Sequence, residues 1–113
     1  MKGLVRPFVA GIGLALLAPL ASGHVVLQKW VASAGYQEYV TLVVPHGCGE
    51  APTTSVRVKI PDGITIVVPE EKAGWTTRVV KRKLPAPVAA EGGARLSEVV
   101  DEVIWSGGSL PTD

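Results

Sequence analysis

The sequence has no dominant charge and only one cysteine, and each shortage narrows the possible classes of protein. Its 113 residues include 11 Lys+Arg against 10 Asp+Glu, which excludes a strongly basic nucleic-acid binder. With 47% hydrophobic and 19% charged residues, the chain also departs from the low hydrophobicity and high net charge of disordered proteins. It contains no phosphate-binding loop, nucleophile elbow or paired-carboxylate motif. The length fits one small domain.

The first 23 residues have the order of a secretory signal peptide. Lys2 and Arg6 give a positive start, residues 8–20 are uncharged and largely apolar, and small residues follow at 21–23. The alternative is a membrane anchor, but the apolar run is shorter than the roughly 20 residues that span a bilayer. We therefore expect an exported protein, periplasmic or otherwise extracytoplasmic, with or without attachment to the membrane. Its mature domain would comprise residues 24–113.

Cleavage after Gly23 would make His24 the first residue of the mature chain. Signal-peptidase preferences also allow cleavage one or two bonds earlier, which would leave Gly23 or Ser22 first. A histidine at the amino terminus offers an amine and an imidazole nitrogen on one residue, and Cu(II) favours such donors. The alternative is an exposed first residue without a role.

Short segments rich in β-branched residues, separated by turn residues, predict strands and no long helix. We expect strands at residues 38–44, 55–60, 64–68, 76–81 and 97–105. The last segment also fits the apolar stripe of a helix, but its β-branched residues and the Gly107-Gly108 pair that follows favour a strand. Residues 61–63 predict a turn, residues 83–93 predict an exposed loop because of their prolines and glycines, and the tail after Trp105 has the composition of a turn. This pattern predicts an all-β protein with an antiparallel sandwich or barrel.

The loop 45–50 places an imidazole, a thiol and a carboxylate within a few positions, at His46, Cys48 and Glu50. Structural zinc sites usually take four ligands, and only one cysteine is present. We expect Cys48 to be half of a disulfide, since export favours oxidation. An odd cysteine then indicates a partner outside the chain, a reactive thiol or a missing piece. His46 is either a metal ligand or a loop residue that hydrogen-bonds the backbone.

The remaining aromatic and basic clusters have simpler interpretations. Large aromatic side chains pack in cores by default, and we expect this of Trp30, Trp75, Trp105, Tyr36 and Tyr39. The run 81–83, Lys-Arg-Lys, is interpreted as a solvated strand end that can also contact an anionic surface.

Several motifs in order resemble one family. They are His-Val-Val-Leu at 24–27, Val-Pro-His-Gly-Cys-Gly-Glu-Ala-Pro-Thr-Thr-Ser at 44–55, Lys-Ala-Gly-Trp at 72–75 and Ile-Trp-Ser-Gly-Gly-Ser-Leu-Pro at 104–111. Together they are similar to the YcnI-like copper-binding domain of bacterial exported proteins, over residues 24–113.

The resemblance implies an immunoglobulin- or cupredoxin-like antiparallel β-sandwich that binds Cu(II). Its implied ligands are the amine and imidazole of His24, in a monohistidine brace, and the carboxylate of Glu50. Relatives often carry Asp before that position, where this chain has Gly49-Glu50. They continue with further strands, a second cysteine and a tryptophan that closes over the metal. The resemblance therefore implies that this chain is truncated, that its sandwich is incomplete and that the partner of Cys48 is missing.

Three functions follow as hypotheses. The first is a non-enzymatic protein that stores, buffers or delivers copper, with an inner-membrane copper transporter or another copper-handling protein as its partner. The second is a copper-dependent oxidative enzyme in which His24 and His46 form a two-histidine brace. The third is a metal-free adhesion or scaffold sandwich in which His24 is incidental.

Overall fold

The computed structural model describes residues 24–29, 31–47 and 49–112. It contains five strands: β1 (Val26–Leu27), β2 (Leu42–Val43), β3 (Thr53–Lys59), β4 (Thr76–Ala89) and β5 (Arg95–Leu110). A 3-10 turn, η1 (Glu91–Gly93), joins β4 to β5, and no α-helix occurs in the described ranges. The predicted all-β class is confirmed. The predicted signal peptide, Trp30 and Cys48 lie outside the described residues.

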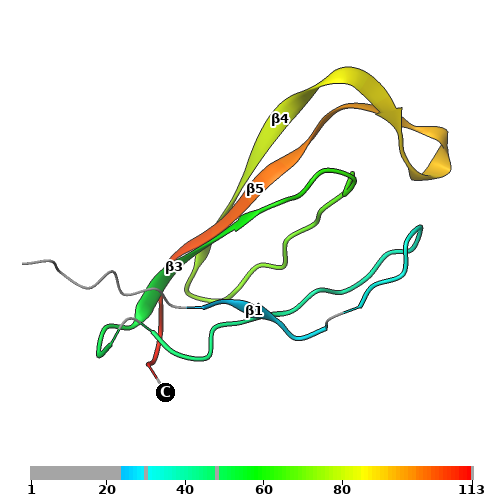
Figure 1. Cartoon of the computed structure of the whole chain (residues 1–113). Helices are drawn as coiled ribbons and strands as arrows, with labels where there is room; N and C mark the ends of the chain where they lie inside the picture. Colours follow the sequence, from blue (N-terminus) through cyan, green and yellow to red (C-terminus); the bar gives the residue numbers. More distant parts are fainter. Residues whose placement is uncertain (1–23, 30, 48, 113) are drawn as a thin grey trace, which may run out of the picture.

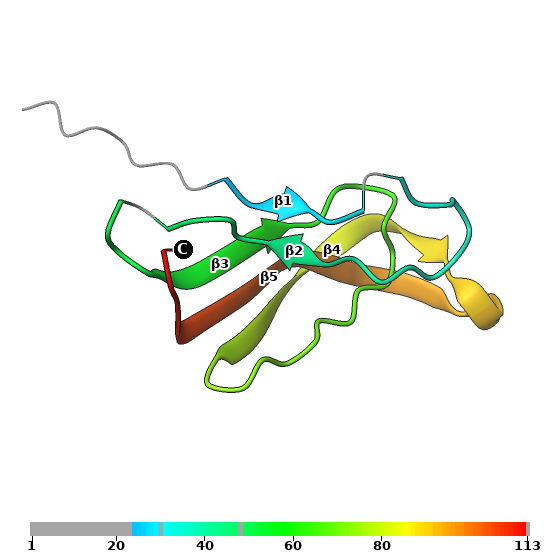
Figure 2. The ribbon, with the colours of Figure 1, turned by 90° about the horizontal axis from the view of Figure 1, so that it is seen from below.

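The strands form two antiparallel sheets in two layers. β1 pairs with β2, and the larger sheet has the order β3-β5-β4. Figure 1 shows β1 below the larger sheet, and Figure 2, which views the molecule from below, shows β1 and β2 lying across it. The arrangement is an antiparallel β-sandwich whose two layers differ greatly in size.

The buried core belongs to β5, the central strand of the larger sheet. Val103 is 1% exposed, and Val99 and Ile104 are also buried. Register places Val103 between Val58 of β3 and Val79 of β4. Only the middle strand has neighbours on both sides, which explains why these three residues lie on it.

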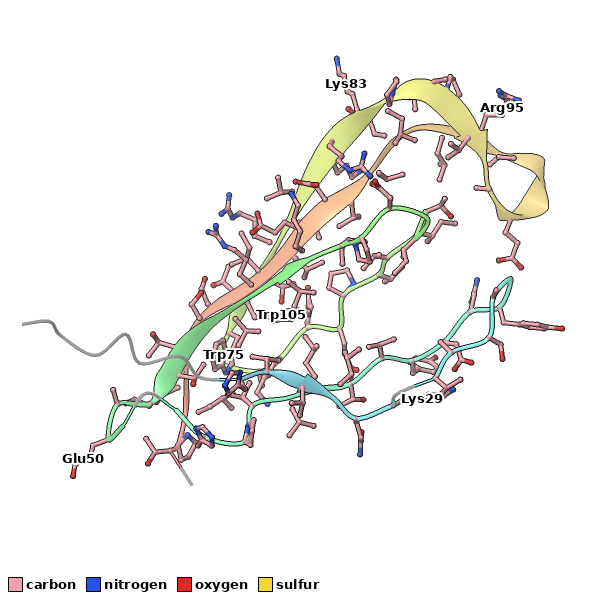
Figure 3. All side chains as sticks on the ribbon, viewed as in Figure 1. Lys29, Glu50, Trp75, Lys83, Arg95 and Trp105 are labelled. Atoms are coloured by element: carbon pink, nitrogen blue, oxygen red, sulfur yellow. The ribbon has the colours of Figure 1, made fainter. Side chains whose placement is uncertain are left out.

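The segment 70–75 is tied to β5 by two tryptophans. The Trp105 indole N–H donates a hydrogen bond to the Glu70 carbonyl at 2.9 Å, and Gly108 lies directly against the Trp75 indole. Both rings are half-buried, and Figure 3 shows them between the two layers. The predicted packing role of Trp75 and Trp105 is therefore confirmed.

Three of the expected strands agree with the structure, and two differ. The expected strand 55–60 falls on β3 except for its last residue, residues 76–81 fall within β4, and residues 97–105 fall within β5. Of residues 38–44 only Leu42 and Val43 pair, and residues 64–68 are extended without joining a described sheet. The strand prediction for 64–68 is wrong because strand-like composition does not provide a hydrogen-bonding partner.

The prediction of a loop at residues 83–93 is wrong for most of that range. β4 continues to Ala89 through Pro85 and Pro87. Proline lacks a donor and is tolerated on an edge strand, and β4 is an edge. The ladder accommodates the prolines by skipping from Lys83 to Val88.

The tail and the tyrosines also differ from expectation. Residues 106–110 complete β5 instead of forming a turn. Tyr36 is 79% exposed and Tyr39 is 97% exposed, so the prediction that they pack in the core is wrong. They lie in the long connection between β1 and β2, beyond the short ladder.

Candidate metal centre

Pairing of β1 with β2 brings the start of the domain to the loop that follows β2. Val26 is opposite Val43 and Leu27 is opposite Leu42, and the Gln28 amide donates to the Thr41 carbonyl at 2.9 Å. Counting outward along this antiparallel register places His24 opposite Pro45. The imidazole of His24 and the loop 45–50 therefore lie at the same end of the small sheet.

The loop 45–50 is compact at its beginning. Gly47 is buried, and a Cβ at this position would overlap the Ala51 carbonyl and lie 3.3 Å from Thr112 Cγ2. Only glycine fits this close approach. The loop is thus held between the start of β3 and the end of β5.

The end of the loop is open. Gly49 has a φ of 61°, in the region that glycine adopts without steric cost, and forms a turn with Glu50. A Cβ at Gly49 would meet no atom within 4 Å. Glu50 is exposed, and Figure 3 shows its side chain at the tip of the turn, pointing away from the sheets.

His46 is exposed, like His24. Its Nδ1 lies 3.4 Å from the Gly47 carbonyl oxygen in its own loop. This distance is at the outer limit of a hydrogen bond. The ring is therefore held only loosely by the backbone, and its other nitrogen faces no partner among the described hydrogen bonds.

The described parts of the chain contain no group of three or more His, Cys, Asp or Glu side chains positioned to hold a metal ion. The structure brings His24 and the loop to one end but leaves Glu50 at the tip of its turn. In the full chain the nitrogen of His24 is an amide linked to Gly23, which is not an amine donor. Cleavage of the Gly23–His24 peptide bond would turn this amide into an amine. Both nitrogen donors predicted for His24 would then be on one residue, so a chelate ring would need no second side chain.

Sequence reasoning proposes His24 and Glu50 as ligands, but it did not predict the close packing of Gly47 and Thr112. No motif in the sequence connects positions so far apart. Only the path of β5 past the loop brings them together.

Within the described ranges, no helix is both long enough and apolar enough to cross a membrane. No curated protein and no solved structure matches the chain significantly. One family does match, described as "Domain of unknown function (DUF1775)", over residues 24–113. This span includes both sheets and the loop 45–50, and the chain therefore belongs to the DUF1775 family.

Proposed function

We propose that the chain is an exported Cu(II)-binding protein that uses His24 to hold copper for storage, buffering or delivery. The observation that carries the proposal is the register of β1 and β2, which brings His24 level with Pro45 at the start of the loop 45–50. Two further facts support it. The family match begins at His24, and YcnI-like proteins are members of this family.

The chemistry of His24 suits Cu(II) as cargo. Once Gly23 is removed, the amine and the imidazole Nδ1 can form one chelate ring, and Cu(II) favours nitrogen and oxygen donors in tetragonal arrangements. Glu50 would add a carboxylate oxygen.

Removal of either nitrogen donor should abolish tight Cu(II) binding. Calorimetric titration would compare the chain that begins at His24 with the same chain acetylated at its amine and with His24→Ala. We expect one tight site in the unmodified chain and none in the other two. Because a terminal amine ordinarily titrates near ~7.7–8.0, affinity should also weaken as pH falls.

His46→Ala is the matched control, since it removes an exposed imidazole from the same end of the molecule. We expect its copper affinity to equal that of the unmodified chain. Retention of tight binding after acetylation or in His24→Ala would overturn the proposal. Mass spectrometry of the exported protein should give a mature chain beginning at His24.

The same register favours a second candidate, a copper-dependent oxidative enzyme, because His46 directly follows Pro45. In that case His24 and His46 would bind one copper as a two-histidine brace. His46→Ala would then lose copper affinity, and the reduced copper-loaded protein would generate hydrogen peroxide in the presence of dioxygen. We propose the carrier, which needs no catalysis, with an inner-membrane copper transporter or another copper-handling protein as its partner.

A further inference from the structure

β4 concentrates positive charge on an open edge of the larger sheet. It carries Arg78, Lys81, Arg82 and Lys83 and contains no acidic residue. Among the strands that the structure describes, the order β3-β5-β4 leaves one side of β4 without a neighbour. A strand in this position presents unpaired backbone N–H groups, which can donate hydrogen bonds to an anion.

Both basic side chains of β3 are paired with carboxylates. Arg57 Nε lies 3.1 Å from Glu102, and Lys59 Nζ lies 2.6 Å from Asp101. On β4, Arg82 is paired too, 2.5 Å from Asp62 and 3.4 Å from Asp101.

Arg78, Lys81 and Lys83 differ from these. All three are exposed, and none forms a salt bridge with any residue that the structure describes. Figure 3 shows Lys83 pointing outward from the β4–β5 hairpin, away from β1.

Carboxylates near β4 cancel only part of this charge. Asp101 and Glu102 are already paired with other cations. Glu98 lies opposite Lys83 in the register and offsets one of the three unpaired charges. An excess of positive charge therefore remains along the edge of β4, although the whole chain is almost neutral.

We propose that the open edge of β4 binds the anionic headgroups of a lipid bilayer through Arg78, Lys81 and Lys83. The charge is spread along an extended strand at a sheet edge, which fits a broad surface of phosphates better than a compact ligand. Long basic side chains from either face of an edge strand can reach the same surface. The inference goes beyond the proposed function and does not depend on copper.

A structural role is the competing explanation. Lysines on an edge strand also keep other strands from pairing with it. That role accounts for exposed Lys81 and Lys83 equally well, but it predicts no preference for anionic lipid and no effect of ionic strength on vesicle binding.

Vesicle co-sedimentation separates the two explanations. Residues 24–113, the span of the family match, would be mixed with phosphatidylcholine vesicles with or without phosphatidylglycerol. We expect binding only to the anionic vesicles, with weakening at higher salt. Lys81→Gln and Lys83→Gln should each reduce binding about 5-fold, the effect of one basic residue near an anionic surface.

Lys72→Gln is the matched control. Lys72 is an exposed lysine outside β4 that forms no salt bridge within the described structure. We expect this variant to bind like the unmodified chain. Equal binding to neutral vesicles, or equal losses in Lys72→Gln and Lys83→Gln, would overturn the proposal. Circular dichroism of each variant would verify that the strands are retained.

Discussion

The lack of a side chain at Gly108 makes room for the Trp75 ring. A Cβ at this position would overlap the Trp75 indole, so Gly108→Ala should push that ring off β5. Overpacking of this kind typically costs about 1–3 kcal/mol. We expect a lower urea midpoint and a red-shifted tryptophan emission. Ser109→Ala, at the exposed neighbouring position, should change neither, and unchanged emission in Gly108→Ala would show that Trp75 does not depend on this contact.

Glu38 has a pKa that is lowered by its surroundings. A hydrogen bond from Lys29, at 2.5 Å, lowers the pKa of Glu38, with help from the Ser33 backbone and the charge of Lys29. A lowered folded-state pKa means that this pair stabilises the chain above the ordinary value of 4.5. The contribution is lost as pH falls through the lowered value.

Lys29→Gln should therefore raise the pKa of Glu38 toward its ordinary value, because the strongest donor and the nearby positive charge are removed. The carboxyl carbon shift of Glu38, followed by NMR against pH, measures this directly. Lys72→Gln removes a lysine that does not pair with Glu38 and should leave the titration unchanged. An identical Glu38 titration in Lys29→Gln would contradict the pairing.

At the scale of the strand, a bulge in β5 organises the charges of the larger sheet. Val80 is opposite Glu102, while Lys81 is opposite Val100. Asp101 is therefore the extra residue, and a bulge re-aims side chains locally. Asp101 lies 2.6 Å from Lys59 and 3.4 Å from Arg82, which links β3, β4 and β5 in one network.

Asp101→Asn should destabilise the sheet by about 1 kcal/mol, since it removes two ion pairs from a network. Urea denaturation at low salt would measure the loss, and high salt should reduce the difference between the variant and the unmodified chain. Asp62→Asn is the comparison, because the Asp62 side chain is 95% exposed and its single pair with Arg82 should contribute less. Equal effects of the two substitutions would argue against a central role for the bulge.

Strands were predictable where the pattern reflects burial. The alternation of Val56, Val58 and Ile60 with Arg57 and Lys59 matches the two faces of β3. The prediction of strands failed where pairing depends on residues distant in the sequence. Residues 64–68 have the composition of a strand but no ladder, whereas Pro85 and Pro87 indicate a loop yet belong to a strand. The local sequence of a segment does not determine which strand, if any, will pair with it in the fold.

Over the whole molecule, the sequence proposes candidate ligands but not how they are arranged. The chemistry of a terminal histidine points to His24, and the resemblance to YcnI-like domains points to Glu50. Neither reveals that His24 lies opposite Pro45, because that follows from the β1–β2 register. The outward position of Glu50 depends on the Gly49 turn, whose direction no spacing rule specifies.

The two layers also differ in the length of their ladders. β1 and β2 share two residue pairs, whereas β4 and β5 remain paired from Thr76 to Ala89 with interruptions. The small sheet should consequently separate and re-form while the larger one stays intact. A cation bound both by His24, which precedes β1, and by the loop after β2 would hold the end of that short ladder together, so that cation binding and the pairing of β1 with β2 become one event.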